Sequence, residues 1–180
     1  MRKRLVAFAI AAFAACRAGE EVAPPRPDII LVTIDTLRAD ALGTGTPFLD
    51  KLSSESVVFT NAHAHNVVTL PSHANILTGL YPYQHGIRDN AGFTLDAKID
   101  TVASLLKRNG YATGAFVGAF PLDARYGLNR GFDVYDDKYP EGKGKLDFVV
   151  AERPAEEVLG AATAWWSAQS APRFVWVHLY

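Results

Sequence analysis

The stretch Asp28-Ile-Ile-Leu-Val-Thr-Ile-Asp35 decides the fold class. Its unbroken apolar run is rich in β-branched residues, which is typical of a strand that is buried on both faces in a parallel sheet under helices. The strand ends on a carboxylate, Asp35. Functional groups of open α/β sheets gather at the carboxyl ends of the strands. The sequence therefore predicts an α/β protein in which Asp35 is either a metal ligand or the cap of a loop.

A second stretch, Asn66-Val-Val-Thr-Leu-Pro-Ser-His-Ala-Asn-Ile-Leu-Thr-Gly79, predicts an extended approach followed by an abrupt helix start. Pro71 suits a first helical turn, because the amide that it lacks has no partner there. Thr69 is placed to be the N-cap, and Gly79 is a natural stop. The helix start then carries a hydroxyl among free amides, a place that binds oxyanions and favours an alkoxide. The alternative is that Thr69 only caps the helix.

Length and composition are those of a globular protein. A chain of 180 residues can hold one ordinary domain, and its 49% hydrophobic and 21% charged residues exclude a disordered chain. The formal net charge of -1 gives no electrostatic reason to expect a nucleic-acid partner. The sequence contains one cysteine, so an internal disulfide is excluded.

The first residues predict export. A basic start, Met1-Arg-Lys-Arg4, precedes an uncharged apolar run from Leu5 to Ala15. That run is too short to span a bilayer as a helix and is typical of a secretory signal peptide. We therefore interpret residues 1–16 as a signal segment.

The run Phe13-Ala-Ala-Cys16 resembles a bacterial lipobox. This resemblance implies cleavage before Cys16 and attachment of a lipid to it, which would tether the protein to a membrane. Plain secretion is the alternative, so the expected location is the bacterial periplasm or a membrane-anchored lipoprotein. Residues 17–27 contain three prolines and mixed charges, which indicates a linker.

Further elements are expected along residues 28–180. Apolar spacing and capping residues predict three more helices and three more strands. The expected helices begin at Thr46-Pro47, at Asp100 or Thr101, and at Pro154; the expected strands are Val57–Phe59, Tyr111–Val117 and Arg173–Tyr180. His63 and His65, at i and i+2, are either metal ligands on one side of a strand or part of a polar loop. The last strand is hydrophobic and ends the chain, so we expect a fragment of a larger domain.

These motifs, in this order, resemble the amino-terminal part of the sulfatase family within the alkaline phosphatase superfamily. The matching segments are Ile34-Asp-Thr-Leu-Arg-Ala-Asp40, Thr46–Leu52, Val58–Ala62, Thr69–Pro82 and His85-Gly86. The resemblance implies an alkaline-phosphatase-like α/β sandwich around a mostly parallel central sheet, of which residues 28–180 are the truncated amino-terminal part.

The resemblance also implies a divalent cation, usually Ca²⁺, beside a nucleophile that attacks sulfur or phosphorus. Asp35 matches a metal-binding aspartate of the family. Thr69 occupies the nucleophile position, next to the metal. His73 stands where the family has an arginine, and it could donate to the nucleophile oxygen or to the ester. The expected catalytic residues are thus Thr69 and His73, and the expected metal ligands are Asp35 and Thr69.

Besides His73 in place of arginine, three departures from the family pattern affect the expected chemistry. Sulfatases oxidise a Cys or Ser at the nucleophile position to formylglycine, and Thr69 cannot form that aldehyde. Thr36 replaces the second aspartate of a metal-binding pair, and Gly114-Ala-Phe-Val117 lacks the family's anion-binding lysine. We expect a metal-dependent hydrolase of sulfate, phosphate or phosphonate esters, small or glycan, with Thr69 as direct nucleophile. The alternative is a catalytically inactive, anion-binding envelope lipoprotein.

Overall fold

The computed structural model describes residues 26–139, 152–170 and 172–180. Its centre is a parallel four-stranded sheet in the order β1-β4-β2-β3. The strands are β1 (Ile29–Ile34), β2 (Ala112–Val117), β3 (Val134–Asp136) and β4 (Arg173–Leu179). The predicted α/β class is confirmed. The predicted signal segment, lipobox and most of the linker lie outside the described residues, and no helix within the described ranges is long and apolar enough to cross a membrane.

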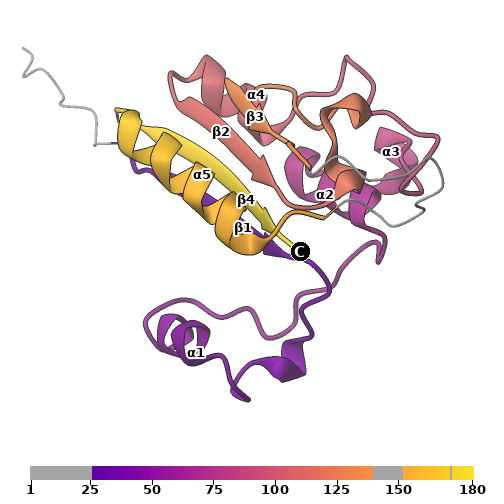
Figure 1. Ribbon diagram of the computed structural model, residues 1–180. Helices are drawn as coiled ribbons and strands as arrows, with labels where there is room; N and C mark the ends of the chain where they lie inside the picture. Colours follow the sequence, from indigo (N-terminus) through magenta and orange to yellow (C-terminus); the bar gives the residue numbers. More distant parts are fainter. Residues whose placement is uncertain (1–25, 140–151, 171) are drawn as a thin grey trace, which may run out of the picture.

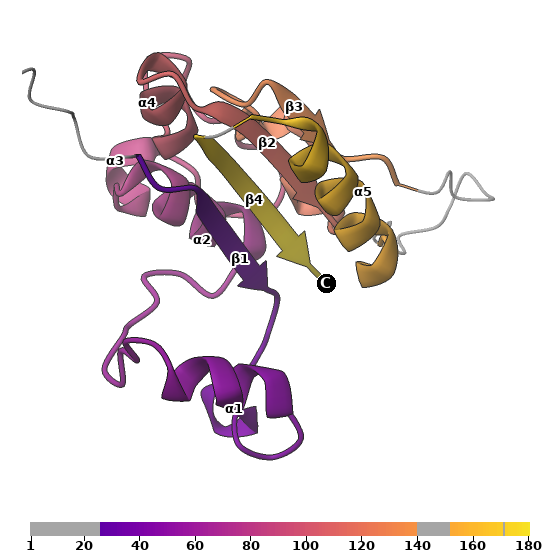
Figure 2. The same cartoon turned by 90° about the vertical axis from the view of Figure 1, so that its left-hand side faces the viewer.

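Helices cover the two faces of the sheet (Figures 1 and 2). Helix α5 (Ala155–Ala168) packs on one face, whereas α2 (Thr69–Thr78), α3 (Pro82–His85) and α4 (Val102–Arg108) lie on the other. Short 3-10 turns are formed by Ala39–Ala41, Phe120–Leu122 and Ala124–Tyr126. Helix α1 (Pro47–Ser54) lies apart from the sheet and buries none of its residues.

Central strand β4 separates the two hydrophobic cores. Successive side chains of a strand point to opposite faces. Phe174 and Trp176 therefore pack with α2 and α4, while Val175 and Val177 pack with α5. All four side chains are buried. Strand β4 is therefore the strand that is buried on both faces.

The expectation that residues 28–35 are buried on both faces is wrong for the described part of the chain. Strand β1 lies at an edge of the sheet, beside β4 only. Its inward side chains pack against the main core, but Ile30 and Val32 on the outer face are 60% and 51% exposed. Helix α5 contacts β4 and β2 instead. The predicted strand Val57–Phe59 is also wrong, since these residues form an exposed loop.

Close packing of α5 depends on a glycine in β2. A Cβ atom added at Gly114 would lie 2.9 Å from Cε2 of Trp165 on α5. Gly160, within α5 itself, has open space around such an atom. The helix can therefore approach β2 because residue 114 has no side chain.

Gly114→Ala should lower the free energy of unfolding by about 1–3 kcal/mol, because the added methyl overpacks the contact with Trp165. Gly160→Ala should raise it by about 0.5–1 kcal/mol, because alanine favours a helix interior. Urea unfolding, monitored by circular dichroism, measures both changes. An unchanged midpoint for Gly114→Ala would contradict this packing.

Candidate active site

A pocket opens at the carboxyl end of β1, where the first turns of α2 meet the sheet. Its volume is about 550 Å³. Three segments line it: residues 33–37, which are the end of β1 and the turn after it, residues 64 and 66–68 of the loop before α2, and Thr69, Ser72, His73 and Ile76 of α2. The sequence-predicted residues Asp35, Thr69 and His73 all belong to this lining. The fold therefore brings together side chains that are up to 38 positions apart, from Asp35 to His73.

Thr69 is not the cap of α2. The N-cap is Val68, which makes no side-chain capping bond, and Thr69 is the first residue of the helix. The hydroxyl of Thr69 instead donates to Oδ2 of Asp35 at 3.1 Å. Asn66 and Asn90 accept from the amides of Val68 and Leu70. The capping interpretation is therefore wrong, and the Thr69 hydroxyl is directed at the carboxylate.

The backbone after Asp35 is strained. Thr36 has a φ of +52° and is the one non-glycine residue of the described ranges with a positive φ. A β-branched residue in this left-handed region costs about 1–2 kcal/mol. Such strain clusters at functional sites. The amide of Asp35 donates to the carbonyl of Leu179 at 2.9 Å, so the residue before the strained one is tied to β4.

His73 lines the pocket and holds a buried acceptor nitrogen. Its Nδ1 lies 2.7 Å from the carbonyl oxygen of Thr69, one helical turn earlier. A carbonyl can only accept, so Nδ1 carries the proton and Nε2 holds a lone pair when the ring is neutral. Burial lowers the pKa of His73, which favours this neutral form. Its Nε2 is buried and has no partner among the described residues. In this state His73 can accept a proton or a ligand but does not donate to the Thr69 hydroxyl.

His178 is a site residue that the sequence reasoning missed. It is fully buried on β4, directly beside Thr33 of β1 in the strand register. Its Nε2 lies 3.8 Å from Oδ2 of Asp35, and its ring centre lies 4.7 Å from that of His73. Burial lowers the pKa of His178 to about 3. The signal in the sequence was the alternation Phe174, Trp176, His178, which places one polar ring on an otherwise apolar strand face.

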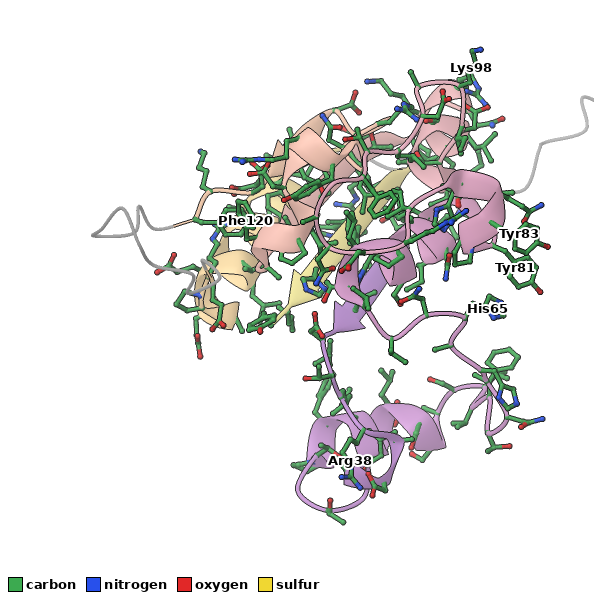
Figure 3. The ribbon with its side chains drawn as sticks, turned by 90° about the vertical axis from the view of Figure 1, so that its right-hand side faces the viewer. Arg38, His65, Tyr81, Tyr83, Lys98 and Phe120 are labelled. Carbon is green, nitrogen blue, oxygen red and sulfur yellow. The ribbon has the colours of Figure 1, made fainter. Side chains whose placement is uncertain are left out.

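The predicted histidine pair does not join this site. His63 contacts the side chain of Asn61 at 3.0 Å, and the ring of His65 lies 4.6 Å from that of Tyr81. Figure 3 shows His65 beside Tyr81 and Tyr83, which follow the carboxyl end of α2. Both histidines are exposed residues of a polar loop, as the alternative interpretation has it.

The donor set for a cation is partial. Asp35 and Thr69 offer a carboxylate and a hydroxyl at the pocket, which are oxygen ligands of the kind that Ca²⁺ takes. Within residues 26–139, 152–170 and 172–180 no group of three or more His, Cys, Asp or Glu side chains could hold a metal ion. These two residues therefore fit a divalent cation in chemistry, but they supply fewer than the six to eight oxygens that Ca²⁺ uses.

Known structures share the fold. One is a protein in complex with its substrate D-glucosamine-2-N,6-O-disulfate, with a TM-score of 0.69 and 24% identity over 86% of this chain and 34% of that one. The phosphonate monoester hydrolase of Agrobacterium radiobacter has a TM-score of 0.67 and 23% identity, over 86% of this chain and 40% of that one. An alkaline phosphatase superfamily protein from Vibrio parahaemolyticus has a TM-score of 0.61 and 22% identity, over 87% of this chain and 40% of that one. These likenesses confirm the predicted alkaline-phosphatase-like fold.

Sequence comparisons give the family. An N-acetylgalactosamine-6-O-sulfatase from Bacteroides thetaiotaomicron is 36% identical over 107 residues, which are 54% of this chain and 21% of that relative. The chain thus spans about a fifth of the length of this relative. The Sulfatase family model matches residues 27–180, which is most of the chain. The resemblance found in the motifs is therefore confirmed, and the chain belongs to the sulfatase family.

Proposed function

We propose that the protein containing this chain is a metal-dependent hydrolase of phosphate, phosphonate or sulfate esters, with the Thr69 hydroxyl as direct nucleophile. The observation that carries the proposal is the hydrogen bond from the Thr69 hydroxyl to Oδ2 of Asp35 at the start of α2. A capping threonine would direct its hydroxyl at the helix amides. Here it is directed at a carboxylate on the wall of a pocket.

The residues have separable roles in this proposal. Asp35 orients the hydroxyl of Thr69 by accepting its hydrogen bond. The oxygen of Thr69 attacks phosphorus or sulfur as its proton passes to Asp35, and the bond to the ester oxygen breaks so that this oxygen leaves with the proton as the alcohol. Water then hydrolyses the ester on Thr69, which releases the acid and restores the hydroxyl. The positive end of the α2 dipole favours negative charge on the ester oxygens. A divalent cation held by Asp35 and Thr69, Ca²⁺ in the first instance, would supply further stabilisation of that charge.

The ester class follows from the side chain at position 69. Thr69 offers a hydroxyl and not an aldehyde, so we propose phosphate and phosphonate esters ahead of sulfate esters. The fold shared with a phosphonate monoester hydrolase is compatible with this order. The name of the N-acetylgalactosamine-6-O-sulfatase relative supports a glycan as one class of substrate, alongside small esters. Export, and a lipid on Cys16, remain part of the proposal.

Thr69→Ala should lower kcat/KM by about 10³-fold or more in the whole protein, because the attacking oxygen is lost. Thr69→Ser keeps an oxygen at the same place and should remain within about tenfold of the wild type. Aryl phosphate, phosphonate and sulfate esters serve as substrates, and mass spectrometry verifies that the introduced serine has not been oxidised. Full turnover by Thr69→Ala would refute the nucleophile. Ester binding without turnover by the wild type would favour the anion-binding alternative.

Thr36→Asp should tighten binding of a divalent cation by about tenfold or more, because it adds a second carboxylate beside Asp35. Aspartate also tolerates a positive φ better than threonine does. Thr36→Asn is the matched control, since it shares that backbone preference but adds no charge. Calorimetric titration with CaCl₂ and with MnCl₂ measures the affinities. Equal affinities for the two variants would place the cation elsewhere.

A further inference from the structure

His178 is a buried polar side chain that the proposed reaction does not use. Its Nε2 has no hydrogen-bond partner among the described residues, although the residue is fully buried. A buried nitrogen without a hydrogen-bond partner destabilises the fold and calls for an explanation. The atom that it faces is Oδ2 of Asp35, at 3.8 Å.

We propose that His178 is a positioning residue, whose Nε2–H holds the carboxylate of Asp35 in line with the Thr69 hydroxyl. This inference rests on the proposed function for its catalytic meaning. Its structural part, that the proton of the neutral His178 ring is on Nε2, can be tested without measuring any activity.

The place of the proton follows from a chain of hydrogen bonds. The indole nitrogen of Trp176 can only donate, and it donates to the hydroxyl oxygen of Thr33 at 3.1 Å. Nδ1 of His178 lies 3.0 Å from the same oxygen. The Thr33 hydroxyl has one hydrogen to give, and Nδ1 can accept it. Nδ1 then holds the lone pair, and the proton of the neutral ring is on Nε2.

The opposite tautomer is disfavoured twice. With a proton on Nδ1, the hydrogen of Thr33 would have no acceptor among the hydrogen bonds of the described residues. The lone pair on Nε2 would then face the carboxylate of Asp35, so two acceptors would be opposed. A doubly protonated ring is disfavoured by the complete burial of His178.

The consequence for Asp35 concerns its two oxygens. Oδ2 receives the Thr69 hydroxyl at 3.1 Å and faces Nε2 of His178 at 3.8 Å. The second distance exceeds an ordinary hydrogen bond, so the contact is an electrostatic one that orients the group. Oδ1 makes no hydrogen bond to any described residue. Both donors are therefore at one oxygen, which leaves the other for a cation in the pocket.

Neighbouring rings hold His178 in place. The ring of His73 lies edge-on at 4.7 Å, and that of Trp176 lies at 6.4 Å. Pairing of β4 with β1 and with β2 places Thr33 and Val117 opposite His178 and fixes its backbone on both sides. A donor whose rotamer and tautomer are both fixed can orient a ligand, and such outer partners typically contribute about 10–100-fold to metal affinity or activity.

The first test is nitrogen NMR of the protein labelled with ¹⁵N-histidine, in which the spectrum of His178→Gln assigns the signal of His178. We expect a proton on Nε2 and none on Nδ1. Thr33→Val removes the hydroxyl with little change in shape and should weaken this preference, whereas Thr113→Val, which removes a buried hydroxyl from β2, should not. A proton on Nδ1, or on both nitrogens, in the wild type would overturn the inference.

The second test separates positioning from packing. His178→Leu fills the space with an apolar side chain that has no donor. It should lower the affinity for Ca²⁺ and Mn²⁺, and kcat/KM for aryl phosphate, by about 10–100-fold. His178→Gln retains an N–H and should recover most of that loss. Equal affinities and rates for the wild type and the folded leucine variant would refute positioning. If the NMR result holds and His178→Leu weakens cation binding, but the wild type shows no turnover, the proposed function fails and the inference about Asp35 stands.

Discussion

The parallel pairing of β1 with β4 joins segments that are 145 residues apart in the chain, as the contact between Thr33 and His178 shows. An ion pair between Asp28 and Arg173 ties the two strands near their start, and the bond from the Asp35 amide to Leu179 ties them at their end. Asp35 is therefore held by a strand that belongs to the far end of the chain. Without that pairing the pocket would lose both its carboxylate and the ring behind it.

Polar groups at this edge of the sheet form one connected arrangement. Trp176 and His178 form its buried side, and Thr33, Asp35 and Thr69 line the pocket. The buried members are uncharged, because an ionised ring inside the core would be costly. Charge is kept at the Asp35 carboxylate, which faces the pocket. This division suits a site that binds a cation and an anionic ester.

The outer face of β1 is exposed because β1 is an edge strand of the sheet. β1 pairs with one strand only, and α5 covers the neighbouring strands instead. The chain spans 21% of one relative and 34–40% of three solved neighbours, so proposals about activity refer to the whole protein. Within this chain the same edge position places Asp35 where its carboxylate reaches both the pocket and α2.

The sequence by itself determined most of the longer local elements and three residues of the candidate site, Asp35, Thr69 and His73. Apolar runs predicted β1, β2, β4 and α5, because hydrophobic periodicity is a local property. The spacing of Thr69, Pro71 and Gly79 likewise predicted a helix start near a hydroxyl. Asp35 could be singled out because it follows a strand. For these features the nearest few neighbours in the chain carry the information.

Tertiary structure alone decided which groups meet and what each one does. Local sequence could not show that Thr69 bonds to Asp35 instead of capping α2, since that depends on the approach of β1 to the helix. It could not place His178 behind the carboxylate, because strand order decides that position, nor show that His73 is neutral, because burial lowers its pKa. Nor could it show which strand is buried on both faces, since a strand's burial depends on the partners that the whole fold gives it.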